Sequence, residues 1–419
     1  MSGPRSASKA FRLHVGIFGR RNAGKSSLLN ALARQDVAIV SAEPGTTTDP
    51  VEKAMELQPI GPVLLIDTAG LDDEGLLGEQ RVARSRRVLE RTDVGLLVAA
   101  GSAWGEPEES LLAELAARGV PALVAFNRAD EAAPAPVALA RLAAAGIPWT
   151  ATAATTGAGL AALRALIVMQ TPAAFREEPA LVSDLVGPGE LAVLVVPIDK
   201  EAPKGRLIMP QVQAIRDLLD GDALSLVVKE RELAEALSLL KRPPRLVVTD
   251  SQAFLKVAAD VPPAIPLTSF SILLARFRGD LVAQTEGALA IGRLRPGDRV
   301  LIAEACSHHP VGEDIGRVKI PRWLTQVVGG ELRIDTVQGL DFPADLADYQ
   351  LVVHCGGCTI TRRTVLGRLA RCREAGVPVT NYGLAIAASL GILERALAPF
   401  PAAQALVTAA SRARSSRPR

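Results

Sequence analysis

The chain has 419 residues, of which 48% are hydrophobic and 22% are charged, and its formal net charge is +2. This length exceeds what one hydrophobic core serves and predicts two or three domains, while the small net charge gives no electrostatic case for binding nucleic acid or an acidic membrane surface. The longest apolar runs, such as 94–100 and 191–196, are strand-length and fall short of the ~20 residues of a membrane helix. We expect no membrane span, and an N-terminus without an apolar signal segment favours a cytoplasmic protein.

Short β-branched runs alternate with helical patterns from Leu13 to about Thr171, beginning with a strand at 13–18. This alternation predicts an α/β domain, assigned to 1–175, with a parallel sheet covered on both faces. A polar stretch rich in proline and glycine at 172–190 predicts a linker, with a domain boundary near residue 180.

A smaller unit, assigned to 176–266, resembles half of a doubly wound sheet. Since so small a unit buries little surface alone, we expect it to pair with a second copy in a homodimer. Its predicted strands are 191–197, 223–228 and 245–249, and its predicted helices are 210–219 and 231–240.

The third α/β unit, assigned to 267–400, begins with helical patterns to about residue 294 and continues with strands at 299–305 and 350–353. The first of these strands is followed directly by Cys306, and the second by His354 and Cys355. Because ligands bind at the carboxyl ends of strands in open α/β sheets, these segments are expected to converge. The remainder, 401–419, ends in a basic run and is predicted to be a disordered tail.

A phosphate-binding loop, Gly19-x-x-x-x-Gly24-Lys25-Ser26, follows the first strand and precedes a helical segment, the context this motif requires. Backbone N–H groups of the loop, continuing through Ser27 at the helix start, would wrap the phosphates. Lys25 would neutralise the β and γ oxygens, and the Ser26 hydroxyl would bind Mg²⁺.

The segment Asn127-Arg-Ala-Asp130 follows an apolar strand and resembles the Asn-Lys-x-Asp guanine signature of small GTPases. In that reading Asp130 accepts hydrogen bonds from guanine N1–H and the exocyclic amine, and the ligand is GTP or GDP. Arg128 replaces the lysine and is expected to alter nucleotide affinity, since a guanidinium is not equivalent to an ammonium. Ala153-Ala154-Thr-Thr-Gly157 is a weaker match to the base-covering loop.

Asp67-Thr-Ala-Gly70 resembles the second Mg²⁺ and γ-phosphate motif, and 44–49 resembles a switch segment in which Thr47 reaches Mg²⁺. Leu71 stands where Ras-like enzymes carry a water-orienting glutamine, so hydrolysis is expected to be slow. Asn22 resembles the asparagine that seats K⁺ in potassium-activated GTPases; the alternative is a plain turn residue. The residues expected to support hydrolysis are Lys25, Asn22 and Thr47.

Cys306-x-His308 and His354-Cys355-x-x-Cys358 hold three of the four cysteines, and histidines occur beside them. Such a set fits either a closed tetrahedral zinc site or a [4Fe–4S] cluster with three thiolates and one different ligand, and the spacing leaves both open. Cys372 lies in a helical stretch and is expected to be a core residue, and His14, inside the first strand, is expected to be structural.

At this point the chain resembles the GTPase of [FeFe]-hydrogenase maturation, a scaffold that accompanies two radical-SAM maturases. Besides the phosphate loop, the matching segments are Pro44–Pro50, Val196–Arg206, Met209–Gln213, Thr249–Gln252, Leu267–Ser271, Ile315–Trp323 and Asn381–Gly383. The resemblance implies a GTP-binding domain, a dimerisation domain and a C-terminal domain in which Cys306, Cys355 and Cys358 hold a [4Fe–4S] cluster. It thereby favours iron and sulfur over zinc, with His308 or His354 as a fourth ligand or a hydrogen-bond partner.

Members of that family carry a binuclear iron precursor transiently and deliver it to apo-[FeFe]-hydrogenase, with GTP hydrolysis as a switch on partner interactions. The alternative is a GTPase of tRNA modification or ribosome assembly, similar to Era and TrmE, with a structural cysteine site. The near-neutral charge and the lack of a basic patch interleaved with aromatic residues disfavour it. A redox-sensing regulator also remains open.

Overall fold

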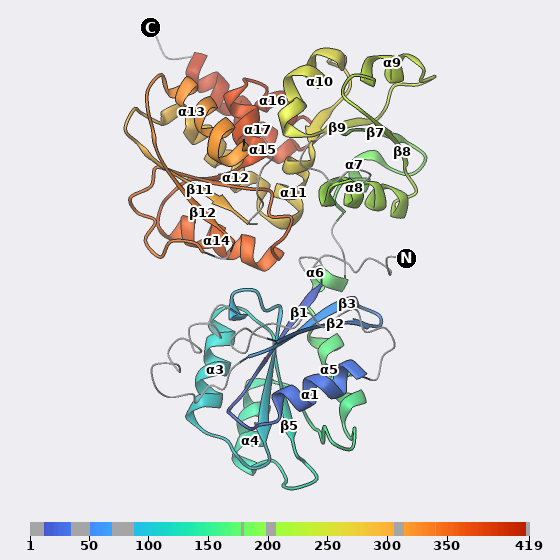
Figure 1. The fold of residues 1–419 in the computed structure, drawn as a ribbon, viewed down its shortest axis with the longest axis vertical. Helices are drawn as coiled ribbons and strands as arrows, with labels where there is room; N and C mark the ends of the chain where they lie inside the picture. Colours follow the sequence, from blue (N-terminus) through green and yellow to red (C-terminus); the bar gives the residue numbers. More distant parts are fainter. Residues whose placement is uncertain are drawn as a thin grey trace. The chain divides into compact units, whose positions relative to one another are not determined.

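The computed structural model of the chain divides into two compact units, Met1–Glu178 and Pro179–Arg419 (Figure 1). No helix in the part of the chain that the structure describes combines the length and apolar character needed to cross a bilayer. The division between the units falls close to the boundary predicted near residue 180. The structure describes residues 12–34, 51–68, 88–176, 180–197, 207–305, 314–339 and 341–415.

The described residues of the first unit form a six-stranded sheet with the order β2-β3-β1-β4-β5-β6. Neighbouring strands are parallel except β2 and β3, which are antiparallel, so the sheet is mixed at this edge. The strands are β1 Leu13–Phe18, β2 Val51–Leu57, β3 Gly61–Asp67, β4 Val94–Ala100, β5 Ala122–Asn127 and β6 Trp149–Ala151, and the helices are α1 Lys25–Arg34, α3 Glu106–Ala117, α4 Pro136–Ala145, α5 Leu160–Gln170 and α6 Ala173–Arg176.

Two hydrophobic clusters explain why this sheet is covered on both faces. Leu13, Val15 and Ile17 of β1 pack with apolar residues of α1 and α5, whereas Phe18 packs with those of α3 and α4. Every residue of β1 is buried, as expected for a strand with helices on both sides. His14 is 3% exposed; its backbone N–H donates to the Asp93 carboxylate, and its carbonyl oxygen accepts from the Asp93 N–H, which confirms its structural role.

The described part of the second unit contains two four-stranded sheets, with the orders β10-β9-β7-β8 and β12-β11-β13-β14. All of their recorded strand pairs are parallel. The first sheet consists of β7 Leu191–Val195, β8 Leu224–Val228, β9 Leu246–Thr249 and β10 Leu267–Ser269, and the second of β11 Arg299–Glu304, β12 Arg333–Gln338, β13 Leu351–His354 and β14 Val379–Asn381.

One hydrophobic core joins these two sheets. It includes Val193 and Val248 from the first sheet and Ile302 and Val353 from the second. The strand β10 follows the predicted boundary at residue 266, yet it pairs with β9 and so completes the first sheet. The helices around this core are α7 Ser183–Val186, α8 Met209–Asp220, α9 Leu233–Ser238, α10 Phe254–Asp260, α11 Phe270–Arg278, α12 Leu281–Ala290, α13 Ile320–Val328, α14 Arg362–Glu374, α15 Tyr382–Ser389, α16 Leu393–Ala396 and α17 Pro401–Ser415.

The described parts of the predicted tail and of the predicted linker both contain defined structure. The prediction of a disordered tail from residue 401 is wrong for 401–415, because α17 buries Ala403 and Val407 in the shared core and contacts α12. Within the predicted linker, the backbone N–H groups of 181–183 donate to the Asp217 carboxylate of α8. In both cases tertiary packing outweighs a polar local composition.

Close packing of α12 on β14 depends on the absence of a side chain at Gly287. A Cβ there would lie 2.0 Å from the Val379 carbonyl oxygen. Gly287→Ala should therefore lower the free energy of unfolding by about 1–3 kcal/mol, measured by chemical denaturation. Gly367→Ala in α14 is the matched control, since a Cβ at Gly367 meets nothing within 4 Å, and it should raise the free energy of unfolding by up to about 1 kcal/mol. Equal effects of the two substitutions would contradict this packing.

Candidate functional site

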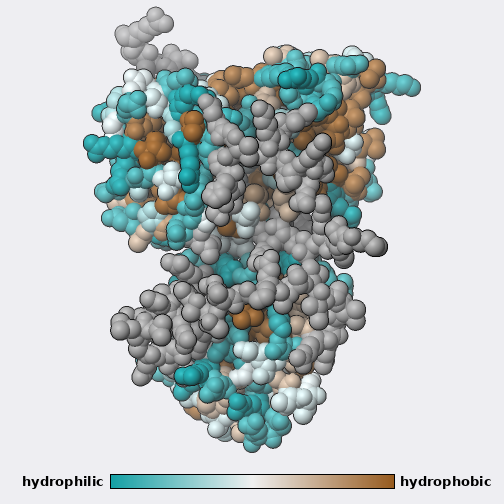
Figure 2. All heavy atoms as spheres, in the orientation of Figure 1, coloured by the Kyte–Doolittle hydropathy of each residue, from teal (hydrophilic) through white to brown (hydrophobic). Residues whose placement is uncertain are grey.

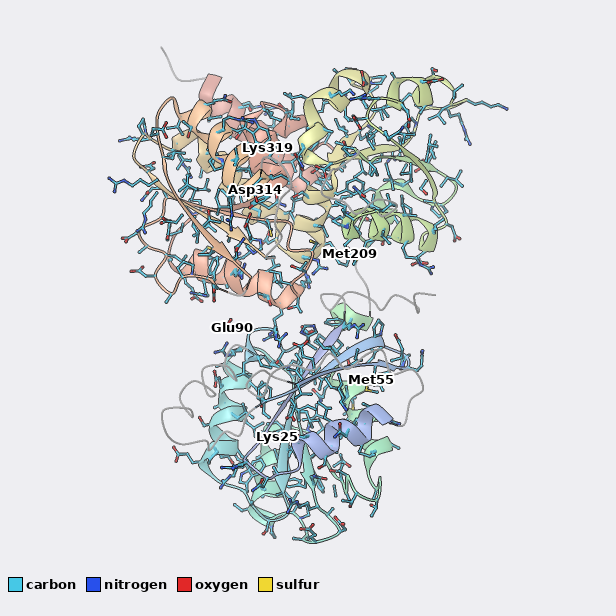
Figure 3. All side chains as sticks on the ribbon, in the orientation of Figure 1. Lys25, Met55, Glu90, Met209, Asp314 and Lys319 are labelled. Atoms are coloured by element: carbon cyan, nitrogen blue, oxygen red, sulfur yellow. The ribbon has the colours of Figure 1, made fainter. Side chains whose placement is uncertain are left out.

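The phosphate loop lies between the carboxyl end of β1 and the start of α1. Lys25 is 8% exposed, and its Nζ donates to the carbonyl oxygens of Gly19 (3.0 Å) and Arg20 (2.8 Å) (Figure 3). The lysine thus lies along the inside of the loop, where a phosphate-binding cation is needed. Asn22 has a φ of 61°, a left-handed conformation that asparagine tolerates better than most residues.

Ser26 and Asp67, both predicted Mg²⁺ ligands, lie together in the structure. Ser26 Oγ donates to Asp67 Oδ2 at 2.5 Å. Asp67 Oδ1 is buried without a hydrogen-bond partner among the described residues, and burial raises the pKa of this carboxyl group. A buried, incompletely paired carboxylate beside a hydroxyl fits a hard divalent cation. Thr47, Gly70 and Leu71 lie outside the described residues.

Asn127, the last residue of β5, connects three predicted segments of the nucleotide site. Its Nδ2 donates to the Ala23 carbonyl oxygen at 3.2 Å, and its Oδ1 accepts from the Ala154 N–H at 3.2 Å. A Cβ at Gly24 would lie 2.2 Å from Asn127 Nδ2, and the φ of Gly24 is 87°. Glycine is therefore required at position 24 both for its backbone conformation and for the approach of Asn127.

Asp130 lies beside the predicted base-covering loop, where its Oδ2 accepts a long hydrogen bond from Thr155 Oγ1 at 3.5 Å. Arg128, the residue that departs from the guanine signature, forms an exposed ion pair with Glu131 at 3.6 Å. An exposed pair of this kind adds little stability. Ser27 lies in the first turn of α1 and is exposed.

An ion pair that the sequence did not reveal fixes the phosphate loop to α3. Arg20 Nε and Nη2 donate to the two carboxylate oxygens of Glu108, each at 2.7 Å, and Glu108 also accepts from the Gly105 N–H. Glu108 is 1% exposed. Glu108 is the third residue after the helix N-cap, Gly105, a position where glutamate often bonds back to the N-cap N–H, so its capping role could have been predicted from the sequence. The pairing of Glu108 with Arg20 could not have been predicted from the local sequence, because the two residues are 88 positions apart.

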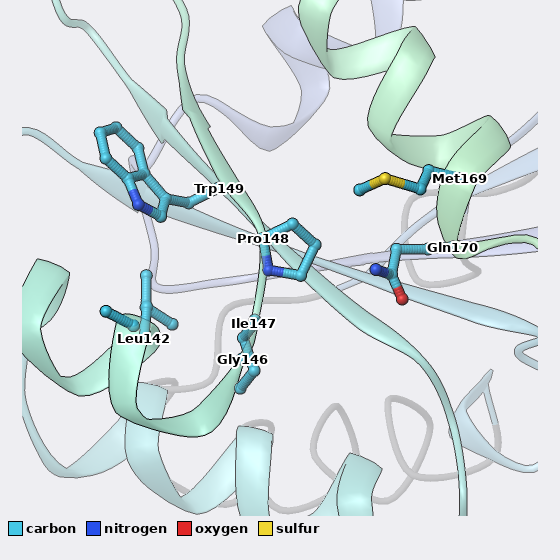
Figure 4. A pocket seen from close by; sticks show the side chains of 8 residues that line it. Leu142, Gly146, Ile147, Pro148, Trp149, Met169 and Gln170 are labelled. Carbon is cyan, nitrogen blue, oxygen red and sulfur yellow. The ribbon is translucent and has the colours of Figure 1, made fainter.

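A pocket of about 410 Å³ lies elsewhere on the first unit (Figure 4). Figure 4 shows Trp149 and Pro148 at the start of β6 and Met169 near the end of α5. Because β6 is parallel to β5, this pocket is at the opposite end of the strands from Asn127. It is therefore separate from the nucleotide site. Its lining residues are Leu142, Ala143, Gly146, Ile147, Pro148, Trp149, Met169 and Gln170.

The cysteine segments meet where β11 and β13 end. The Cys355 N–H donates to the Ala303 carbonyl oxygen at 2.9 Å, and Cys355 Sγ accepts from the Ala305 N–H at 3.0 Å. Thr359 Oγ1 donates to the Ala305 carbonyl oxygen at 3.1 Å. Cys355 and Cys358 are both half-buried. The two chain segments are thus bound to each other at the residue that precedes Cys306.

Cys306 and His308 themselves lie outside the described residues. Within the described ranges, no group of three or more histidine, cysteine, aspartate or glutamate side chains is arranged to hold a metal ion. Cys372 is fully buried in α14, and burial raises the pKa of its thiol to about 11. The prediction that Cys372 is a core residue is confirmed.

Both ring nitrogens of His354 already have partners. Nδ1 lies 2.7 Å from the Cys355 carbonyl oxygen, and Nε2 lies 3.0 Å from Arg368 Nη1. Since a carbonyl only accepts and a guanidinium only donates, Nδ1 carries the proton and Nε2 accepts. Burial, with the nearby Arg368 charge, lowers the pKa of His354 to about 4, so the ring is neutral. This arrangement favours a hydrogen-bonding role for His354 over that of a fourth ligand.

Glu304, two residues before Cys306, is another buried acid that sequence reasoning missed. It is 1% exposed, and it accepts hydrogen bonds from Tyr382 Oη at 3.3 Å and Gln338 Nε2 at 3.1 Å. A Cβ at Gly316 would lie 2.1 Å from Tyr382 Oη, so this glycine is needed for the tyrosine to reach Glu304. Glu304, Tyr382 and Gln338 thus form a hydrogen-bonded group at the end of β11, next to the segment that leads to Cys306.

Comparison with known proteins identifies the family. A model described as the hydrogen maturase F dimerization domain matches residues 181–279, and one described as its tetramerization domain matches 282–399. Together they cover more than half of the chain. The chain belongs to the hydrogen maturase F family. A third model, described as a 50S ribosome-binding GTPase, matches residues 14–128, so this hydrogen maturase F chain carries a GTPase domain ahead of its dimerization and tetramerization domains.

Curated relatives resemble this hydrogen maturase F chain over its GTPase domain. The tRNA modification GTPase MnmE of Methylobacterium sp. (strain 4-46) is 41% identical over 172 residues, covering 40% of this chain and 35% of that protein. MnmE of Synechococcus sp. (strain CC9605) is 43% identical over 120 residues, covering 28% and 26%. The chain thus spans about a third or less of the length of these relatives.

Among solved structures, the chain is similar to the G domain of the T. maritima FeoB iron transporter. The two are 27% identical, the TM-score is 0.28, and the match covers 38% of this chain and 98% of that chain. Era in complex with MgGDPNP and nucleotides of 16S ribosomal RNA is 20% identical, with a TM-score of 0.32 and coverage of 52% and 91%.

The nucleotide geometry leads to a test of base selection. Asp130→Asn should weaken GTP binding by about 10- to 100-fold, because charge-assisted hydrogen bonds worth roughly 1.5–3 kcal/mol are lost. The variant should gain affinity for xanthosine nucleotides, whose carbonyl can accept from the new amide. Calorimetric titration measures both affinities. Glu131→Gln, which alters only the exposed partner of Arg128, is the control and should bind GTP normally. If ATP competes as well as GTP in the unmodified protein, Asp130 is not the base-selecting residue.

Proposed function

We propose that this hydrogen maturase F family protein is a GTP-regulated scaffold. In this proposal Cys306, Cys355 and Cys358 hold a [4Fe–4S] cluster, and the protein carries a binuclear iron precursor to apo-[FeFe]-hydrogenase together with two radical-SAM maturases in the cytoplasm. The hydrogen bond from the Ala305 N–H to Cys355 Sγ carries the proposal. Ala305 directly precedes Cys306 in the sequence, so this bond joins the Cys355 sulfur to the end of the described segment that leads to Cys306.

The donor set supports this assignment. Three thiolates with no fourth cysteine nearby in the sequence suit a cubane cluster, which when bound would supply one iron with an exchangeable position. The Ala305 N–H stabilises negative charge on Cys355, as N–H donors to a cluster sulfur do. His354 holds the Cys355 carbonyl in place, leaving the fourth position to His308 or to another exchangeable ligand.

An exposed apolar surface on the second unit suits self-association, in keeping with the match to a dimerization domain. The strand β8 forms an edge of its sheet, and side chains on it and on neighbouring helices are exposed. Figure 2 shows hydrophobic residues gathered in the region where Figure 1 places β7, β8 and α9. We propose that a second copy of the chain covers this surface, whose exposed residues include Val212, Leu219, Leu224, Val227 and Leu239.

The tRNA modification alternative rests on the MnmE relatives, whose similarity lies in the GTPase domain. It gives no account of the match of residues 181–399 to hydrogen maturase domains. We therefore do not adopt it.

Hydrolysis of GTP is proposed to be slow, Mg²⁺-dependent and stimulated by K⁺. Lys25 binds the phosphates, Ser26 and Asp67 hold the metal with Thr47, and the Asn22 side chain contributes to a K⁺ site. Replacing Na⁺ by K⁺ should raise the hydrolysis rate, measured as the rate of phosphate release. Asn22→Gly should remove the stimulation but retain GTP binding, because glycine keeps the left-handed backbone while losing the amide. Full stimulation in Asn22→Gly would leave Asn22 as a turn residue only.

The cluster assignment is tested by matched cysteine variants of the full-length protein, prepared without oxygen. Cys358→Ser should lose bound iron and sulfide, the EPR signal of the reduced cluster and the ability to activate apo-hydrogenase. Cys372→Ser, which changes a buried thiol of α14, should retain all three properties. Both variants should hydrolyse GTP, since the nucleotide motifs lie in the first unit. Full cluster occupancy in Cys358→Ser, or stoichiometric zinc without iron in the unmodified protein, would overturn the assignment.

A further inference from the structure

The helix α11 connects the first sheet of the second unit to the cysteine loop. It begins directly after β10, where Ser269 Oγ accepts from the Ile272 N–H, and it packs against α8, α14 and α15. A Cβ at Gly356, between the two cysteines, would lie 3.4 Å from Leu274 of α11. The helix is also fixed at Ser271, whose carbonyl oxygen accepts from Asn381 Nδ2 at 2.7 Å. The cysteine loop therefore lies directly on α11.

Arg278, the last residue of α11, is buried beneath this loop. It is 2% exposed, and its Nη1 donates to the carbonyl oxygen of Ile360, two residues after Cys358. The following residue, Gly279, ends the helix in a crowded position, where a Cβ would lie 2.3 Å from Gln284 Nε2 and 2.9 Å from the Ala275 carbonyl oxygen. The guanidinium thus joins the end of α11 to the segment that follows Cys358.

The charge of Arg278 acts on Cys358. Burial raises the pKa of the Cys358 thiol, and the nearby guanidinium opposes this effect. Burial also lowers the pKa of Arg278 to about 10, which leaves the side chain positively charged at neutral pH. A [4Fe–4S] cluster held by three thiolates is negatively charged overall, and more so after reduction.

We propose that Arg278 is a positioning residue for the cluster: it fixes the 358–360 segment through the Ile360 carbonyl and places a permanent positive charge beside the Cys358 sulfur. This inference rests on the proposed cluster function. The charge favours the reduced cluster over the oxidised one, since the reduced state carries one more negative charge. Arg278 thus sets the reduction potential from outside the ligand set, as hydrogen bonds and nearby charges do at other iron–sulfur sites.

Three substitutions of Arg278 separate charge from anchoring. Arg278→Met removes the charge and fills the buried space with an apolar side chain, Arg278→Gln keeps a donor for the Ile360 carbonyl without charge, and Arg278→Lys keeps the charge. Arg276→Met is the matched control, because Arg276 lies on the same helix but pairs with Asp184 at 3.1 Å and is partly exposed. Each full-length protein is reconstituted with iron and sulfide without oxygen, and its midpoint potential is measured by EPR-monitored titration.

The Met and Gln variants should both have a more negative midpoint potential than the unmodified protein, whereas the Lys and Arg276→Met variants should match it. If the Met variant does not fold, as judged by circular dichroism, the Gln and Lys pair gives the same comparison. A purely structural role would lower thermal stability or cluster content while leaving the potential unchanged, and that result would overturn the inference. Failure of the unmodified protein to take up a cluster would instead refute the proposed function itself.

Discussion

Parallel pairing of β11 with β13 brings together the two described chain segments that lead into the cysteine site. The register places Ala303 opposite His354, so the residues that follow both strands emerge at the same edge of the sheet. From this one backbone constraint follow the N–H contact from Ala305 to Cys355, the burial of Glu304 beside Tyr382, and the position of the loop above α11. The first unit has the same arrangement, because the phosphate loop follows β1, and Asp67 and Asn127 are the last residues of β3 and β5. In both units, chemistry gathers where parallel strands end.

The sequence was sufficient wherever a signal was local. The strand at 13–18 agrees with β1 at both ends, and the predicted strands and helices of the small central unit lie within a few residues of β7, β8, β9, α8 and α9. The motif from Asn127 to Asp130 begins at the last residue of β5, as the sequence predicts. These predictions rest on buried β-branched runs and turn chemistry, which neighbouring residues specify almost completely.

Long-range features could not be predicted in this way. The pairing of Arg20 with Glu108, the contact of Arg278 with Ile360, and the partners of His354 join residues distant in sequence. A basic or acidic residue in a helix is most often a solvated one, so its burial becomes evident only when another element packs over it. The helix α17 was not predicted for a related reason. Its small apolar residues, such as Ala403 and Val407, indicate a buried helix only once the core that they pack against is known.

The shared core of the second unit bears on how the protein can be dissected. Apolar residues of both four-stranded sheets belong to one cluster, and α11 closes the first sheet while supporting the cysteine loop. The two segments that match separate hydrogen maturase F domains are therefore not independent folding units in this chain. A fragment cut between α11 and α12 would expose the apolar faces of both sheets to water, and such surfaces promote aggregation. Fragments meant to retain the cysteine site need to span both sheets, from α7 through α17.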